Sequence, residues 1–415
     1  MQVCIHRGSK QIGGSCVELK CDGQRLLLDL GLPLDAEGDN AKYLPNVQGL
    51  DGSDPSLLGI LISHPHLDHF GLLGHVASTI PVGLGPAARR ILMAAAPFLP
   101  GERVIPAVGW DYVSGKKFQV GPFSITPYLV DHSAYDSYAL LIECAGKTIF
   151  YSGDFRDHGR KSALFDQLLR ALPKQIDVML LEGSSLGRLA ETETFPSEMD
   201  IENDLLAAFK NTKGMALVHT SIQNIDRIVS IYRASRRSGR KLIIDLYAAS
   251  ILAATGNKHI PQSNWDDVLL FVPHAQRLQV KNNAWFDLLQ SHAANRIFPE
   301  QLPDIAAQAT LLFRPMHRFD LTRAKCLGGA GYIYSQWCGY WDQGCYSRVK
   351  EWLEEQQIPK MDIHTSGHAS TKTLKILVEV IGPKRLVPIH SFYPERYPEL
   401  FPNVTIESDT IWWDV

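Results

Sequence analysis

The sequence contains no uncharged apolar run long enough to cross a membrane, and no low-complexity tract or internal repeat. Its first residues, Met1 to Arg7, also lack the apolar core that a secretory signal needs. With 45% hydrophobic and 20% charged residues, the 415-residue chain has the composition of an ordinary globular protein. We therefore expect a soluble, cytoplasmic protein of two domains with no membrane partner.

Cysteine and net charge are also scarce. The chain has seven cysteines and no Cys-x-x-Cys pair, which predicts reduced, buried thiols and argues against a disulfide framework or a structural zinc site. The formal net charge of −3 argues against a wholly basic nucleic-acid binder, while a local basic groove remains compatible with it. Charge alone therefore neither supports nor excludes a nucleic-acid substrate.

What the sequence does contain is a dense group of histidines at 64–69, directly after the apolar run 57–62. Alternate residues of an extended chain share a face, so His64 and His66 are expected to point the same way. The turn that follows directs Asp68 and His69 toward a second position. Imidazole and carboxylate ligands without thiolate favour Zn²⁺ ahead of Mn²⁺ or Fe²⁺. The segment predicts a loop that feeds two adjacent metal ions, and the alternative is a polar surface loop rich in histidine.

Other apolar stretches also end in a carboxylate. Strands are predicted to lead into Asp29, Asp154 and Glu182. Because active sites are commonly assembled where strands end, we expect these residues to meet the His64 group at one edge. Asp29 is interpreted either as a turn residue or as a partner that orients a ligand histidine. The pair Gly13-Gly14 is interpreted as a turn, with a phosphate cradle as the alternative.

From about Ser197 the pattern changes to alternating helices and strands, which predicts a parallel sheet with crossover helices. Aromatic residues gather between Tyr332 and Trp341. They are interpreted as domain packing, with base stacking as the alternative. From Asp362 onward the chain returns to histidine-rich segments, which end at His368 and His390.

Together these segments resemble the metallo-β-lactamase superfamily. The residues that carry the resemblance are Asp29, the segment 64–69, His132 and the segment 152–156. Glu182, the segment 366–368 and the segment 388–390 resemble motifs A, B and C of the β-CASP branch, which contains nucleic-acid processing nucleases. The resemblance implies an α/β fold, with a four-layer αββα metallo-β-lactamase domain at 1–196 and 358–415. An α/β β-CASP domain is implied as an insertion at 197–357.

The resemblance also implies roles for individual residues. The metal ligands that it implies are His64, His66 and His132 for one Zn²⁺, Asp68, His69 and His390 for the other, and Asp154 as a bridge. The residues that it places in catalysis are Asp68, Asp154, Glu182 and His368, with Asp29 behind the ligands. The positions that resemble phosphate contacts of the ribonuclease J group are His364, Ser366, Gly367 and Ser370.

We predict a ribonuclease with two Zn²⁺ that hydrolyses phosphodiester bonds of single-stranded RNA with a metal-activated hydroxide, as an endonuclease, a 5′-exonuclease or both. Histidine at motif C, here His390, is associated with RNA-processing members of the branch. The alternatives are a DNA-processing nuclease, a hydrolase of small esters or thioesters, and a scaffold without activity. Many bacterial ribonuclease J proteins carry a C-terminal domain beyond the position of Val415, so a homodimer like theirs is left open.

Overall fold

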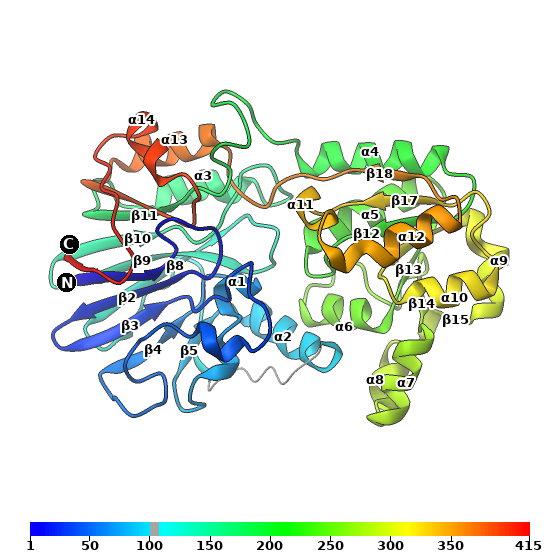
Figure 1. Ribbon diagram of the computed structural model, residues 1–415, viewed down its shortest axis with the longest axis horizontal. Coiled ribbons are helices and arrows are strands. Elements are labelled where there is room, and N and C mark those ends of the chain that lie inside the picture. The colour runs from blue at the N-terminus through cyan, green and yellow to red at the C-terminus, as the bar shows by residue number, and fades with distance from the viewer. Residues whose placement is uncertain (100–107) are drawn as a thin grey trace. The chain divides into compact units, whose positions relative to one another are not determined.

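The structure is a computed structural model that describes residues 1–99 and 108–415 (Figure 1). It divides into two compact units, Met1–Phe195 with Gly367–Val415, and Pro196–Ser366. The second unit extends past the predicted end at residue 357. The reason is that the strand Lys360–Asp362 pairs with a strand of the second unit's own sheet, in the register Ile333 opposite Met361.

The first unit contains two sheets whose strands are ordered differently from the chain. The order in one sheet is β20 (Trp412–Asp414), β1 (Gln2–Arg7), β2 (Cys16–Cys21), β3 (Gln24–Leu28), β4 (Leu57–Leu61), β5 (Val82–Leu84) and β6 (Val108–Asp111). The order in the other is β19 (Arg385–Ile389), β11 (Val178–Glu182), β10 (Lys147–Tyr151), β9 (Ser137–Cys144), β8 (Phe123–Val130) and β7 (Phe118–Val120). Strands β3 and β4 are parallel, and so are β10, β11 and β19. Parallel neighbours bring their carboxyl ends to the same edge of a sheet.

Alternation along the strands explains how the sheets stack. On β3, Leu26 and Leu28 belong to a core that also holds Leu180 of β11, whereas Leu27 faces the opposite way. On β11, Met179 likewise belongs to a separate cluster. Since neighbouring side chains of a strand point to opposite faces, one apolar core lies between the two sheets and two more lie outside them.

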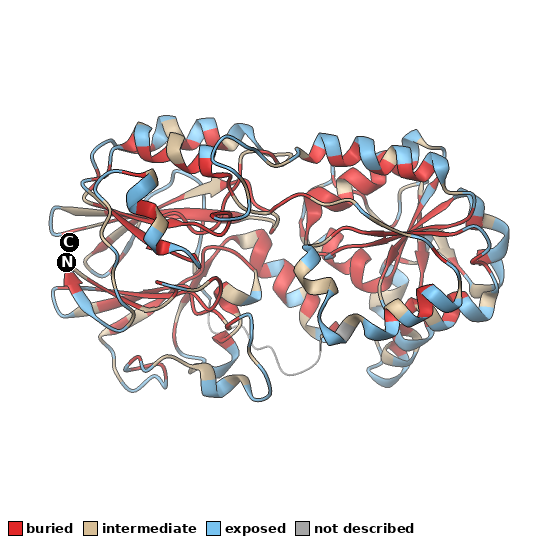
Figure 2. Ribbon diagram, turned by 45° about the horizontal axis from the view of Figure 1, so that its top comes forward, coloured by how far each residue is buried: buried red, intermediate tan, exposed pale blue. Residues whose placement is uncertain are grey.

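Helices cover the two outer faces. The helices of this unit are α1 (Leu67–Phe70), α2 (Pro86–Ala95), α3 (Ala163–Ala171), α13 (Thr371–Ile381) and α14 (Tyr397–Leu400). Ala88 and Leu92 of α2 pack on the first sheet, and Leu168 of α3 and Leu377 of α13 pack on the second. Figure 2 shows the buried faces of these helices turned toward the strands. The arrangement is the four-layer αββα architecture that the resemblance to the metallo-β-lactamase superfamily implies.

The second unit is built on a parallel sheet. Its strand order is β15 (Arg296–Ile297), β14 (Val268–Phe271), β13 (Lys241–Ile244), β16 (Ala309–Phe313), β12 (Ala216–His219), β17 (Gly331–Tyr334) and β18 (Lys360–Asp362). Every pairing among these strands is parallel. The helices that connect them include α4 (Glu198–Asn211), α5 (Ile225–Arg237), α6 (Leu246–Ala254), α7 (His274–Asn282), α8 (Phe286–Ser291), α9 (Leu302–Ile305), α10 (His317–Ala324), α11 (Cys338–Trp341) and α12 (Ser347–Glu355). The parallel sheet predicted from the alternating pattern is therefore confirmed.

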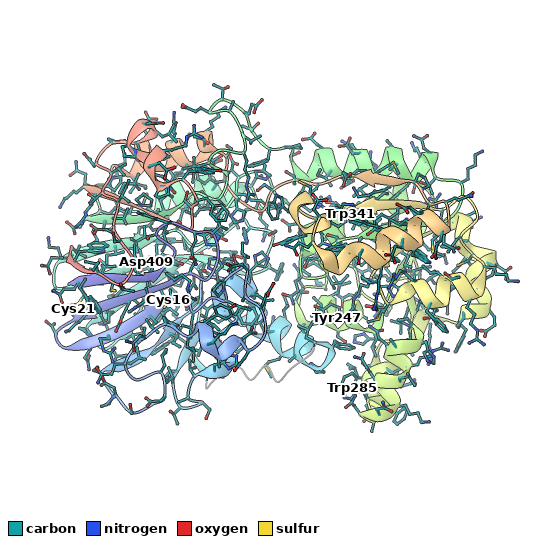
Figure 3. All side chains as sticks on the ribbon, in the orientation of Figure 1. Cys16, Cys21, Tyr247, Trp285, Trp341 and Asp409 are labelled. Atoms are coloured by element: carbon teal, nitrogen blue, oxygen red, sulfur yellow. A yellow bond between two sulfur atoms is a disulfide. The ribbon has the colours of Figure 1, made fainter. Side chains whose placement is uncertain are left out.

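The aromatic residues between 332 and 341 pack within the second unit. Tyr332 and Tyr334 are fully buried in a core that includes Trp352 of α12. Trp341, labelled in Figure 3, packs against that core and stacks at a tilt on Tyr334 with a centroid distance of 4.9 Å. The packing interpretation of this cluster is confirmed for these residues.

The prediction that the cysteines are reduced is wrong for one pair. Cys21 at the end of β2 forms a disulfide with Cys144 at the end of β9. Figure 3 shows Cys21 at the opposite end of the strand from Cys16. The two partners are 123 residues apart in the chain, so only the stacking of one sheet on the other brings them together. Their spacing in the sequence carries no sign of this.

Within the described ranges, no helix combines the length and the apolar character that crossing a membrane requires. The cytoplasmic location expected from the sequence stays a prediction.

Candidate metal centre

Seven histidine and aspartate side chains of the first unit converge at the carboxyl ends of its strands. One group consists of His64, His66 and His132, and another of Asp68, His69, Asp154 and His390. Within each group the potential ligand atoms all lie within 4.8 Å of one another. These are the seven residues that the sequence predicts as metal ligands, so the fold brings that whole set together. Their role as ligands stays a prediction.

Asp154 lies between the two groups. Its Oδ2 atom is 3.2 Å from Nε2 of His69 and 3.6 Å from Nε2 of His390. The same oxygen is 3.6 Å from Nε2 of His64, which belongs to the other group. The side chain is 1% exposed. Asp154 is therefore the carboxylate best placed to belong to two coordination spheres.

Asp29 orients His69 directly and His64 through Ser63. It lies after β3 with φ +58°, in the left-handed region, and is fully buried. Its carboxylate accepts hydrogen bonds from Nδ1 of His69 at 2.7 Å, the Ser63 hydroxyl at 2.8 Å and the Tyr151 hydroxyl at 2.6 Å. Because Ser63 donates to Asp29, its oxygen accepts from Nδ1 of His64 at 3.0 Å. Both histidines thus keep Nε2 as the nitrogen that turns toward the centre.

His132 is oriented by a backbone carbonyl. Its Nδ1 donates to the carbonyl oxygen of Gly367 at 2.6 Å, which leaves Nε2 without a proton and 3.1 Å from Nδ1 of His66. A Cβ atom at Gly367 would come within 2.5 Å of the Ser133 hydroxyl oxygen. Glycine at this position therefore lets the chain approach His132 closely.

The glycine-rich segment near the N-terminus contacts His390. The Gly13 N–H donates to Nδ1 of His390 at 3.3 Å, and the Ser15 hydroxyl lies 2.9 Å from the same nitrogen. His390 itself has φ +53°, also in the left-handed region. Residues held in this conformation cluster at functional sites, where the surrounding structure supports the strain. Gly13 belongs to the wall of the centre and does more than turn the chain.

Several polar atoms at the centre of this cluster have no hydrogen-bond partner among the described residues. They are Nε2 of His64, Nε2 of His69, Nε2 of His390 and both carboxylate oxygens of Asp154. Buried polar atoms are rarely left unpaired, because each costs about 1–3 kcal/mol. A cluster of them aimed at one point is what a site for divalent cations requires. The nitrogen and oxygen donors present fit Zn²⁺.

Burial keeps most of these imidazoles neutral. It holds the pKa of His64 and of His132 well below the usual value, and it lowers the pKa of His66 to about 4. Burial also lowers the pKa of His390. Since a metal binds the neutral form of imidazole, these four side chains have the charge state that a ligand needs.

The carboxylates reverse this effect at His69. Burial lowers its pKa, but the charges of Asp154, Asp68 and Asp29 outweigh burial and raise the pKa well above its usual value. At Asp154 burial raises the pKa, while the neighbouring histidines, foremost His390, outweigh it and hold the pKa well below its usual value. Asp154 therefore stays ionised and can attract cations.

A third group consists of Asp154 with Glu182 and His368, two of the residues predicted to act in catalysis. Asp154, Glu182 and His368 also offer ligand atoms within 4.8 Å of one another. Nδ1 of His368 donates to Oε2 of Glu182 at 3.0 Å, and the other carboxylate oxygen of Glu182 accepts the Phe155 N–H at 3.0 Å. Burial lowers the pKa of His368, but Glu182 and Asp154 outweigh it and raise that pKa. This histidine is therefore disposed to carry a proton beside the centre.

The predicted phosphate-binding residues are divided between the two units. Gly367 and Ser370 lie in the first unit, whereas His364 and Ser366 lie in the second. The Ser370 oxygen caps α13 by accepting the Thr373 N–H at 3.3 Å. Its contact with phosphate, like those of the other three residues, stays a prediction.

Comparison with known proteins first defines the class. Residues 25–220 match the family model of the beta-lactamase superfamily domain. With the αββα layers and the histidine-aspartate cluster, this match shows that the chain contains a metallo-β-lactamase fold domain. The crystal structure of a protein of unknown function from Enterococcus faecalis V583 has the same fold over 99% of both chains, with a TM-score of 0.79 and 21% identity.

Over most of its length the chain is similar to proteins named ribonuclease J. It is 23% identical to that of Helicobacter pylori (strain ATCC 700392 / 26695) over 412 residues, which cover 93% of this chain and 55% of the relative. It is 24% identical to that of Synechocystis sp. (strain ATCC 27184 / PCC 6803 / Kazusa) over 413 residues, which cover 92% and 59%. The chain thus spans little more than half the length of these relatives.

Proposed function

We propose that the chain is a zinc-dependent ribonuclease that hydrolyses phosphodiester bonds of single-stranded RNA. The observation that carries the proposal is the set of unpaired, buried nitrogen and oxygen atoms around Asp154. The similarity to proteins named ribonuclease J over most of the chain also supports the proposal. We also propose that residues 196–366 form a β-CASP domain, because its position in the chain agrees with the insertion that the sequence predicts.

In this proposal the ligands are the seven residues of the two groups. His64, His66 and His132 would hold one cation, Asp68, His69 and His390 would hold the other, and Asp154 would serve both. When bound, two Zn²⁺ supply an activated water and positive charge opposite the phosphate.

Other residues of the chain orient groups and move protons. Asp29 fixes the ring of His69 through the bond to Nδ1. His368 donates a proton to the leaving oxygen of the scissile bond, and Glu182 orients His368 and stabilises its charged form. The raised pKa of His368 keeps its donating form populated to higher pH than an ordinary histidine would allow.

The metal content of the purified protein tests the ligand set. We expect close to two equivalents of zinc per chain by elemental analysis after purification without chelators, because the seven predicted ligands form two groups. Manganese as the dominant metal would keep the site and change the assignment of the cation. A protein that holds no transition metal under these conditions, and takes up none on addition, contradicts the proposal.

The substrate is tested by matched RNA and DNA. We expect faster turnover of a single-stranded RNA than of the DNA of the same sequence, at equal concentration and fixed ionic strength, since phosphate contacts make binding dependent on salt. Equal or reversed rates would favour the DNA-processing alternative. RNAs with 5′-monophosphate, 5′-triphosphate and 5′-hydroxyl ends, compared by product length, distinguish endonuclease from 5′-exonuclease cleavage.

A further inference from the structure

Two exposed aromatic side chains, Phe392 and Tyr393, lie just after His390 of the metal centre, with Ser391 between. Phe392 is 52% exposed and Tyr393 is 45% exposed, although both are large and apolar. The buried Ser391 fixes the backbone of this turn, because its hydroxyl donates to the carbonyl oxygen of Gly183 at 3.2 Å and accepts the Tyr393 N–H at 3.2 Å. Neighbouring aromatic rings that stay exposed at a fixed place beside a reaction centre suggest a binding surface.

The Tyr393 ring rests on the loop that follows Glu182. A Cβ atom at Gly187 of this loop would come within 2.9 Å of Cε2 of Tyr393. Gly187 also has φ +82°, a conformation that favours glycine. The Tyr393 ring therefore belongs to the loop after His390 and packs against the backbone of the loop after Glu182. Nearly half of its surface stays open to a ligand.

The loop on which this ring rests also carries a positive charge. Arg188 follows Gly187 and is exposed. The positive charge of Arg188 acts on His368: it lowers the pKa of that histidine, as burial does, although Glu182 and Asp154 outweigh both effects. Arg188 is thus close to the residue proposed to protonate the leaving group. Aromatic rings and cations together are the groups that bind a single nucleic-acid strand, because the bases stack on the rings and the phosphates are attracted by the charges.

We propose that Tyr393, with Phe392 beside it, is a stacking platform for a base that flanks the scissile phosphate of single-stranded RNA. The platform rests on the function proposed above and deepens it. Stacking tolerates any base, so the platform contributes affinity and position and no sequence preference. A small ester without a base has nothing to place there.

The proposal is tested by steady-state kinetics on a short single-stranded RNA. Replacing the ring in Tyr393→Leu is expected to raise KM by roughly 5- to 150-fold, the usual range for loss of one stacked base. The value of kcat changes little, because stacking is present in both the bound and the transition state. Gly187→Ala, which displaces the ring without removing it, should raise KM in the same direction. The control is Trp412→Ala, which removes a 39% exposed aromatic ring from the edge strand β20 and should leave KM unchanged.

A modified substrate provides a test on the unaltered protein. An RNA with one abasic ribose, moved position by position past the cleavage site, should show a rise in KM at one flanking position. Tyr393→Leu should be insensitive to the abasic ribose at that position. The stacking platform is wrong, and the proposed ribonuclease function is unaffected, in either of two cases. In the first, the unaltered protein cleaves RNA but an abasic ribose raises KM at no position. In the second, Tyr393→Leu leaves KM unchanged, as Trp412→Ala does. If the unaltered protein cleaves no RNA, the proposed function fails and the platform with it.

Discussion

Asp154→Ala is expected to lose bound metal and nearly all activity. A residue that hydrogen-bonds to a metal ligand contributes about 10- to 100-fold to metal affinity. Asp154 should contribute more because it faces both ligand groups. Its Oδ2 atom is within 3.6 Å of a nitrogen of His64, of His69 and of His390. Elemental analysis and the cleavage rate at saturating RNA are the measurements.

Thermal unfolding separates loss of metal from loss of fold. A cation that binds only the native state raises its stability by RT ln(1 + [L]/Kd), which is about 4 kcal/mol at 1,000 times Kd. Chelator should therefore lower the Tm of the unaltered protein and leave that of Asp154→Ala unchanged. In the metal-free state the variant also loses the ion pair between Oδ2 of Asp154 and Nε2 of His69, which are 3.2 Å apart, so the measurement is the shift in Tm that chelator causes in each protein and not the difference in Tm between them.

The matched control for this variant is Asp166→Ala, which removes an exposed carboxylate from α3 of the same unit. It should retain metal, activity and the chelator effect. If Asp154→Ala keeps two equivalents of zinc, the bridging role is wrong even if activity is lost.

The four layers are expected from the resemblance to the metallo-β-lactamase superfamily, and the apolar runs of the predicted strands agree with them. Leu26, Leu27 and Leu28 form an unbroken apolar run, which is typical of a strand buried on both faces, and the structure places them alternately in two cores. The carboxyl-end position of Asp29 and Glu182 follows from the same runs. These features are local, so a single sequence contains them.

Long-range contacts are the features that the sequence does not contain. Tyr151 donates to Asp29 across 122 positions, and Ser15 lies beside His390 across 375 positions. Neither residue stands at a motif, and a serine or a strand tyrosine has many ordinary places in a fold. Their contribution depends on which strands become neighbours, which is decided by the packing of the two sheets.

The boundary of the second unit illustrates the same limit. The expected return to the first domain at residue 358 follows from the resemblance to the β-CASP branch, which implies an insertion between motifs A and B. The strand Lys360–Asp362 is short and polar, and only its pairing with β17 assigns it to the second sheet. Element boundaries are generally the least secure part of a prediction from sequence.

His368→Ala separates metal binding from proton transfer. His368 is bonded to Glu182 at 3.0 Å and is 3.7 Å from Asp154, so it lies at the rim of the metal centre. If it is the proton donor, the variant should keep its zinc and its affinity for RNA while losing about 10²- to 10⁴-fold in rate. The matched control is His75→Ala, which removes an exposed histidine of the same unit and should change neither zinc content nor rate.

The leaving group decides whether the lost rate reflects protonation. RNA cleavage expels an alkoxide, which needs a proton, whereas a model phosphodiester with nitrophenolate expels a stable anion that needs little help. The deficit of His368→Ala should therefore shrink on the nitrophenolate substrate. Because the pKa of His368 is raised, its donating form is present below that pKa and is lost as pH rises through it. The unaltered protein should accordingly lose rate on the alkaline side with RNA and much less with the nitrophenolate ester. An equal deficit on both substrates, or loss of zinc from the variant, would reassign His368 to metal binding or to positioning of the phosphate.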